Sequence, residues 1–158
     1  MSHQVQPPQV FRLRSGPDKT IVEQRVGRME ESCRHMRLPM TQTRRVIVRV
    51  LAEMEDHPDA HEIMHRVSAI IPGISPATIY RTLAIFEQAG VLHRREFGRG
   101  RARYENADKS HHHMVDRDSG DITDFRSQAL DEVVRKIARD MGYELVDYSL
   151  FLYGDARE

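Results

Sequence analysis

The chain has 158 residues, and its 24 lysines and arginines balance 24 aspartates and glutamates, so the formal net charge is zero. This length allows one ordinary domain or two small ones, and because no run of about 18 apolar residues exists, a membrane-spanning helix is excluded. The opening MSHQVQPPQVFRLRSG lacks the apolar core of a secretory signal, so we expect a cytoplasmic protein with no membrane partner.

Residues 1–20 contain three prolines and little apolar periodicity, which predicts a mobile N-terminal extension. Apolar residues at helical spacing then predict a helix over 21–36. Thr41 is placed to cap a second helix that runs to Met54, and Asp59 to cap a third.

The segment ISPATIYRTLAIFEQAGVL predicts a fourth helix, with Ser75 as N-cap, Pro76 at the first helical position and Gly90 as the stop. Two short strands follow, VLHRREF and RARYEN, joined by a turn with two glycines. Three short helices and a basic hairpin are typical of a winged helix-turn-helix. We therefore predict a DNA-binding domain over 21–105.

The remaining residues differ in kind. HHHMVDRDSGDITDF predicts two strands around a turn, SQALDEVVRKIARDMG an amphipathic helix, and YELVDYSLFLYG a final strand. A β-β-α-β module over 106–158, after a hinge near 105–110, is too small to bury a secure core alone. The predicted fold class is therefore α+β, with an N-terminal winged helix and a small C-terminal dimerisation domain.

Charge divides the chain in the same place. Residues 1–104 hold 17 basic and 11 acidic side chains, whereas 105–158 hold 7 and 13. Of the 24 basic residues 21 are arginines, whose planar fork suits phosphate contacts. A basic front and an acidic back indicate two modules with different partners.

In a helix-turn-helix, the first turns of the second helix contact bases in the major groove. For an isolated pair, the favoured interpretation would be that Tyr80 is partly a core residue and Arg81 is merely solvated. The basic hairpin that follows reverses this preference and favours DNA contact. The candidate DNA-contacting residues in and around this motif are Ser75, Thr78, Tyr80, Arg81, Arg44, Arg45 and the wing residue Arg99.

Three consecutive histidines are the strongest chemical signal. Side chains on a strand alternate between faces, so His111 and His113 share one face and His112 takes the other. Two imidazoles on one face begin a divalent-metal site. Further imidazole and carboxylate ligands are available at His57, Glu105 and Asp124. A set without thiolate suits Fe, Mn or Zn without deciding among them.

Ordered motifs from about 26 to 154 resemble the ferric uptake regulator family of bacterial metalloregulators. They are MTQTRRVIVRVL, DHPDAHEI, ISPATIYRTLAIFEQAGVL, GRARYE, HHHMVDRDSGDITDF and GYELVDYSLFLYG. The resemblance implies a homodimer that binds an AT-rich palindromic operator as a repressor. It also implies one divalent metal, Fe²⁺ or Mn²⁺ with Zn²⁺ also accepted, at a hinge site formed by His57, Glu105, His111, His113 and Asp124.

Several positions depart from the family pattern. Many members hold a structural zinc with two CxxC pairs, but Cys33 is the only cysteine here, so no structural cysteine-bound zinc is expected. A second metal site common in the family retains only His112 and Asp131, since Tyr148 replaces a usual histidine. Pro39 replaces a groove-inserting lysine, which neighbouring Arg37 could substitute. Members without CxxC pairs are familiar among regulators of the alphaproteobacterial type.

Other functions remain open from the sequence. The histidine run also resembles the branch that responds to haem and iron status, although no Cys-Pro haem motif exists here. A peroxide-responsive member and a metal-independent winged-helix regulator with structural or pH-responsive histidines are further alternatives. A metalloenzyme is disfavoured, because the candidate site has no obvious catalytic base beside it and the small chain implies no substrate cleft. His61 and His65 of HEIMH lie four apart on the predicted third helix, a spacing that can chelate metal, but solvated helix residues are the favoured interpretation. We expect a regulator and not an enzyme.

Overall fold

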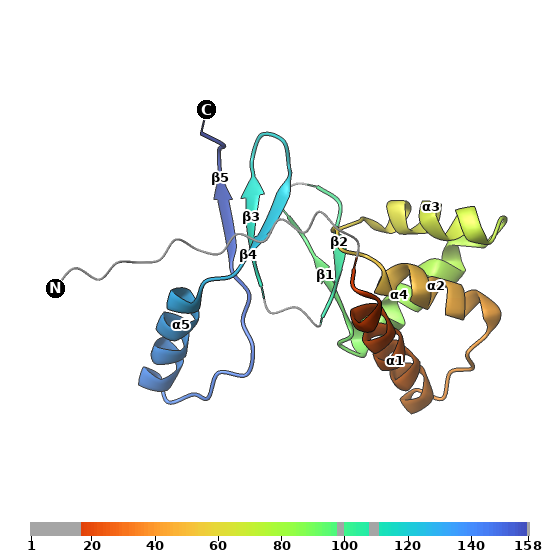
Figure 1. Cartoon of the computed structure of the whole chain (residues 1–158), viewed down its shortest axis with the longest axis horizontal. Coiled ribbons are helices and arrows are strands. Elements are labelled where there is room, and N and C mark those ends of the chain that lie inside the picture. The colour runs from red at the N-terminus through yellow and green to blue at the C-terminus, as the bar shows by residue number, and fades with distance from the viewer. Residues whose placement is uncertain (1–16, 98–99, 108–110, 158) are drawn as a thin grey trace. The chain divides into compact units, whose positions relative to one another are not determined.

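The computed structural model describes residues 17–97, 100–107 and 111–157. They form two compact units, one built from the described residues up to 107 and the other from those after 110. Figure 1 labels the elements of both units. Among the described residues, no helix has the length and apolarity needed to cross a membrane.

The N-terminal unit contains four helices: α1 (Lys19–His35), α2 (Gln42–Ala52), α3 (Ala60–Ile70) and α4 (Pro76–Gln88). Side-chain hydrogen bonds cap the starts of α1, α2 and α3. The Thr41 hydroxyl accepts from the backbone N–H of Arg44 at 3.2 Å. Asp59 and Glu62 form a reciprocal capping box at the start of α3.

One predicted helix start needs correction, and another is confirmed without a capping hydrogen bond. Helix α1 begins two residues before the predicted position, because Asp18 accepts a hydrogen bond from the backbone N–H of Thr20 at 2.7 Å. Ser75 occupies the N-cap of α4, but its side chain makes no capping hydrogen bond. Pro76, whose φ is already suited to a helix, marks that start instead.

The hairpin after α4 consists of β1 (Leu92–Arg95) and β2 (Arg103–Asn106), which pair antiparallel. Gly90, with φ of +70°, ends α4 and turns the chain into β1. The hairpin and the four helices share one core. Its fully buried members include Met29, Cys33, Ile47, Leu51, Ile63, Val67, Ile79, Leu83, Phe86 and Leu92.

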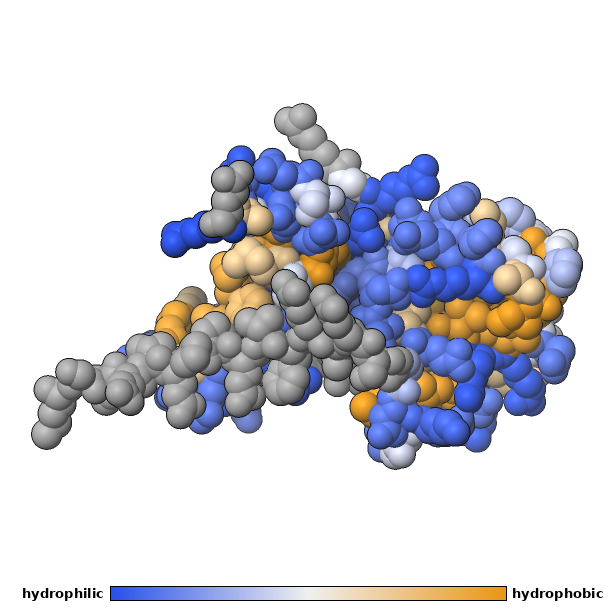
Figure 2. Space-filling view, turned by 45° about the horizontal axis from the view of Figure 1, so that its top comes forward, coloured by the Kyte–Doolittle hydropathy of each residue, from blue (hydrophilic) through white to orange (hydrophobic). Residues whose placement is uncertain are grey.

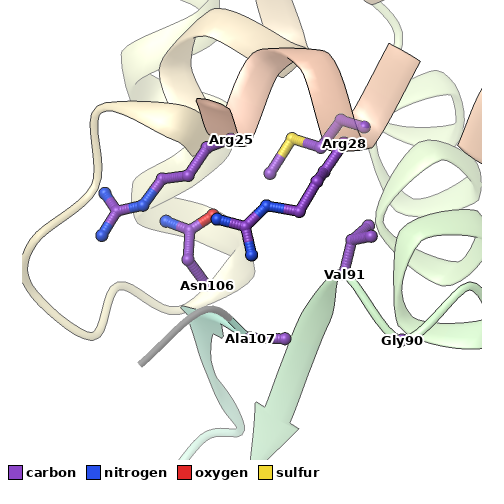
Figure 3. Close-up of a pocket in the computed structure, with 7 residues that line it drawn as sticks. Arg25, Arg28, Gly90, Val91, Asn106 and Ala107 are labelled. Carbon is purple, nitrogen blue, oxygen red and sulfur yellow. The ribbon is translucent and has the colours of Figure 1, made fainter. Parts of the chain in front are cut away.

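Side chains from α1 and β2 cap the carboxyl end of α2. Arg25, only 2% exposed, donates through Nη1 to the carbonyls of Ala52 at 2.9 Å and Met54 at 3.2 Å. The same nitrogen lies 2.8 Å from a Glu55 oxygen. Asn106 Nδ2 donates to the carbonyl of Leu51 at 2.9 Å. Arg25, Arg28 and Asn106 line a pocket of about 60 Å³. Figure 3 shows these side chains.

Replacing Arg25 with methionine is expected to lower the free energy of unfolding by roughly 3 kcal/mol, because a buried charged donor and its bonds are lost. Urea denaturation would measure this. Arg34→Met is the matched control on the same helix. Arg34 is 67% exposed and pairs only with Glu31 among the contacts described, so a change of less than about 0.5 kcal/mol is expected. Equal effects of the two substitutions would contradict the structural role of Arg25.

The C-terminal unit is a three-stranded sheet with one helix. Its strands are β3 (His112–Asp116), β4 (Ile122–Phe125) and β5 (Phe151–Gly154), in the order β4-β3-β5. Strand β3 pairs antiparallel with β4 and parallel with β5. Helix α5 (Gln128–Asp140) connects β4 to β5, so the predicted β-β-α-β order is correct.

The final strand is shorter than predicted. Residues 143–154 were expected to be extended, but only Phe151–Gly154 form a strand. Strand β3 offers a ladder of only four residue pairs to this segment, from His113–Phe151 to Asp116–Gly154. Of the predicted 1–20 extension, residues 1–16 lie outside the described residues, as does the wing residue Arg99.

Candidate metal centre and nucleic-acid interface

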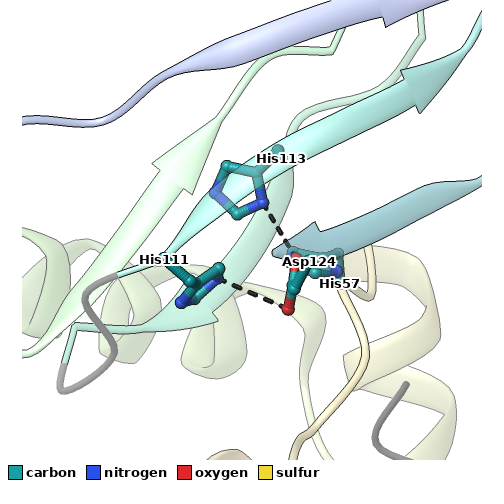
Figure 4. A group of neighbouring side chains, drawn as sticks. All are labelled: His57, His111, His113 and Asp124. Carbon is teal, nitrogen blue, oxygen red and sulfur yellow. Dashed lines mark hydrogen bonds and ion pairs between the residues drawn. The ribbon is translucent and has the colours of Figure 1, made fainter. Parts of the chain in front are cut away.

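Three ligand-type side chains meet at the start of β3 in the C-terminal unit. Nδ1 of His113 lies 3.0 Å from one Asp124 carboxylate oxygen, and Nε2 of His111 lies 3.4 Å from the other. Figure 4 shows both imidazoles turned toward this carboxylate. The two-residue spacing on one strand brings the imidazoles together, and pairing of His113 with Asp124 in the ladder supplies the acid.

This cluster is buried and held by packing. His113 is 1% exposed and His111 7%. The two imidazoles meet edge to face at 4.7 Å, and His113 stacks on Phe151 with ring centroids 5.0 Å apart. Two imidazoles and a carboxylate in a fixed arrangement are ligands that suit a divalent first-row cation.

A second pair of ligand-type side chains lies in the N-terminal unit. Nε2 of His57, in the turn between α2 and α3, lies 3.3 Å from Oε2 of Glu105 in β2, and both side chains are less than 10% exposed. The backbone N–H of Tyr104 donates to the carbonyl of Pro58 at 2.9 Å. This bond holds the turn against β2, so residues 48 positions apart in the sequence form one pair.

His112 and Asp131, the residues left for a second metal site, are bonded to each other and to Tyr148. Nε2 of His112 lies 3.4 Å from Asp131 Oδ1 and 3.0 Å from the Tyr148 oxygen, while the Tyr148 hydroxyl donates to Asp131. Burial, together with the hydrogen bond to Asp131, raises the pKa of Tyr148 to about 12. A neutral phenol is a poor metal ligand. These three side chains therefore fit a structural hydrogen-bond network between β3, α5 and the segment before β5 better than they fit a cation site.

The exposed side of α4 carries the candidate DNA-contacting residues. Ser75, Tyr80 and Arg81 are exposed, Tyr80 by 51%, and Thr78 is half-buried. Tyr80 is therefore not a core residue. Arg37 is exposed in a left-handed conformation, with φ of 54°.

Two arginines at the start of α2 already have partners within the unit. Arg44 donates to the carbonyl of Pro39, and Arg45 lies 3.5 Å from Glu30. Phosphate contact by either residue would compete with these bonds.

Two wing residues have roles that the sequence did not suggest. Arg95 and Arg103 belong to the basic hairpin predicted from VLHRREF and RARYEN. Arg95 Nε donates to Glu105 at 3.2 Å, and Arg103 Nη1 donates to the carbonyl of His57 at 2.9 Å. Strand alternation was the one sequence signal for this proximity to the ligand-type residues, since Arg103 and Glu105 are two residues apart and share a face.

Comparisons with known proteins identify the family of the chain. The model of the ferric uptake regulator family matches residues 35–153. The chain belongs to the ferric uptake regulator family. It is therefore a metal-responsive transcriptional regulator and not an enzyme, and the predicted α+β fold class is confirmed.

Individual family members agree with this assignment over most of the chain. A ferric uptake regulation protein of Rhizobium leguminosarum bv. viciae is 42% identical over 127 residues, covering 80% of this chain and 89% of the relative. A solved zinc-bound manganese uptake regulator is 40% identical, with a TM-score of 0.63 over 82% of this chain and 98% of the other. The ferric uptake regulator from Pseudomonas aeruginosa, solved with manganese, is 32% identical with a TM-score of 0.75 and the same coverage.

Proposed function

We propose that the protein is a metal-activated repressor of iron or other divalent-metal homeostasis genes. One divalent cation, Fe²⁺ or Mn²⁺ with Zn²⁺ also accepted by the donors, would be bound at the hinge. Its ligands would be His57 and Glu105 from the N-terminal unit and His111, His113 and Asp124 from the C-terminal unit. The observation that carries the proposal is the presence of a buried imidazole–carboxylate group in each unit, on either side of residues 106–110.

The donor chemistry fits such a cation. Three imidazoles and two carboxylates, with no thiolate, suit Fe, Mn or Zn. When bound, the cation would supply a crosslink between ligands of two units. A cation held by ligands from both units would restrict their relative orientation. Metal binding would then favour the orientations in which the ligands converge, by the difference in affinity between the states.

The DNA-contacting role is assigned to the N-terminal unit. We place Ser75, Thr78, Tyr80 and Arg81 of α4 in the major groove, where a tyrosine ring can pack on a thymine methyl and an arginine can contact guanine. Arg37, Arg44, Arg45 and the wing residue Arg99 would contact phosphates of an AT-rich palindromic operator. The exposure of Tyr80 and Arg81 supports this assignment.

A palindromic operator requires a two-fold symmetric protein, and α5 supports a homodimer. None of the residues in α5 is buried. Val133, Ile137 and Met141, spaced four apart on one face, are 55%, 52% and 68% exposed. Figure 2 shows apolar side chains at the surface of both units. Val133, Ile137 and Met141 form an apolar stripe on α5. In so small a module, the stripe would be buried by packing against a second copy of the chain.

The test is DNA binding by the full chain with and without metal. An AT-rich palindromic duplex, selected from a random pool by the manganese-loaded protein, would be titrated with Mn²⁺, Fe²⁺ or Zn²⁺ present and again after chelation. We expect binding about 5- to 150-fold tighter with the effective metal, the range of typical allosteric coupling. Undiminished binding after chelation would favour a metal-independent regulator.

A further inference from the structure

The two ligand-type residues of the N-terminal unit are each bonded to an arginine of the wing. One oxygen of Glu105, Oε2, lies 3.3 Å from His57, while the other, Oε1, accepts a hydrogen bond from Arg95 Nε at 3.2 Å. Arg103 Nη1 donates to the backbone carbonyl of His57 at 2.9 Å. The carboxylate thus has one oxygen turned to the imidazole and the other held by a cation.

The register of the hairpin explains this arrangement. Arg95 and Arg103 are cross-strand partners, and so are His93 and Glu105. All four side chains therefore share one face of the wing, and the contact from Arg95 to Glu105 is a diagonal one. Arg94 lies on the opposite face, is 41% exposed and pairs with Glu96 at 3.0 Å. Neighbouring arginines of one strand thus have different partners.

We propose that Arg95 and Arg103 are positioning residues for the metal ligands Glu105 and His57, and that they link metal binding to the geometry of the wing. This inference rests on the proposed function. Residues that hydrogen-bond to metal ligands fix the orientation of the ligands, and their loss typically lowers metal affinity by about 10- to 100-fold. Here those residues lie in the element that follows the recognition helix.

Two opposing effects of Arg95 must be compared. Its positive charge repels a cation bound nearby, whereas its hydrogen bond holds the Glu105 carboxylate toward His57. Arg95 is 27% exposed and Glu105 only 8%, so solvent weakens the repulsion more than it weakens a direct hydrogen bond to a buried carboxylate. Orientation should dominate, and removal of Arg95 should weaken metal binding.

The experiment measures Mn²⁺ affinity of the full chain by calorimetry in the absence of DNA. Arg95→Met and Arg103→Met keep most of the aliphatic stem but lose the donors, and each is expected to bind Mn²⁺ about 10- to 100-fold more weakly. Thermal unfolding without metal should stay near that of the wild type. Arg95→Lys, which retains a charged donor, should recover part of the lost affinity. A purely structural role would alter unfolding and leave affinity unchanged.

Arg94→Met is the matched control, because it changes the adjacent arginine on the other face. It should retain wild-type Mn²⁺ affinity. Wild-type or tighter affinity in both Arg95→Met and Arg103→Met would overturn the inference while leaving the proposed function intact. If the wild-type chain itself binds no Mn²⁺, Fe²⁺ or Zn²⁺, the proposed function fails first, so the two failures are distinguishable.

Discussion

Replacing His113 with alanine is expected to abolish metal-dependent operator binding, with metal affinity lowered by at least about 100-fold. Loss of a partner outside the ligand set already costs about 10- to 100-fold, and His113 is a proposed ligand itself. Its Nδ1 lies 3.0 Å from Asp124, and its side chain is 1% exposed. Calorimetric titration with Mn²⁺ and operator binding at saturating metal would measure both effects.

A second variant separates ligand loss from loss of packing. His113 stacks on Phe151, so His113→Ala also leaves a cavity. Asp124→Asn keeps the shape of the side chain but removes its charge, and it should lose the metal response with little change in unfolding temperature. His65→Ala is the control, since His65 is an exposed histidine on α3. If Asp124→Asn and His113→Ala both retain the metal response, the proposed ligand set is wrong.

The local elements of the N-terminal unit could be predicted because their signals are short-range. Thr41, Asp59 and Pro76 mark helix starts in the sequence and do so in the structure. Glycine with positive φ ends α4 and follows α5. The length of the strand in YELVDYSLFLYG could not be predicted in the same way. That length depends on how many residues β3 can pair, which is a property of the partner strand.

The candidate site was predictable to the extent that it follows strand periodicity. His111 and His113 share a face with two-residue spacing, and the structure brings both to Asp124. The contacts of Arg95 and Arg103 required the register of the hairpin and the position of the 53–59 turn. Sequence alone reports that a wing is basic, but it does not separate arginines that face solvent from those bonded to Glu105 or His57.

The neutral net charge conceals how many arginines of the basic N-terminal unit are already bonded within that unit. The excess of basic residues before position 105 suggested a surface for phosphate. In the structure, Arg25, Arg95 and Arg103 bond to groups of their own unit. The charge available to DNA is therefore smaller than the count implies. Exposed arginines such as Arg81 of α4 and Arg94 of β1 carry more of the expected salt dependence.

Replacing Ile137 with aspartate is expected to dissociate the homodimer and, with it, tight operator binding. Ile137 lies in the middle of the α5 stripe between Val133 and Met141. A second copy packed on this stripe would bury an unpaired carboxylate, and a central interface residue of this kind typically costs about 2–4 kcal/mol, which corresponds to roughly 30- to 1,000-fold in the dimer dissociation constant. Sedimentation equilibrium at micromolar protein would detect the shift to monomer.

Arg139→Gln provides a control with the same change in net charge. Arg139 is exposed in the last turn of α5, away from the stripe, and its replacement should leave the dimer intact. Because Ile137 is 52% exposed within one copy, its substitution should also leave monomer folding and Mn²⁺ binding close to those of the wild type. A dimer that persists in Ile137→Asp would place the two-fold interface elsewhere on the C-terminal unit. Monomers that still bind metal but no longer bind the palindromic operator tightly would show that operator affinity depends on both copies.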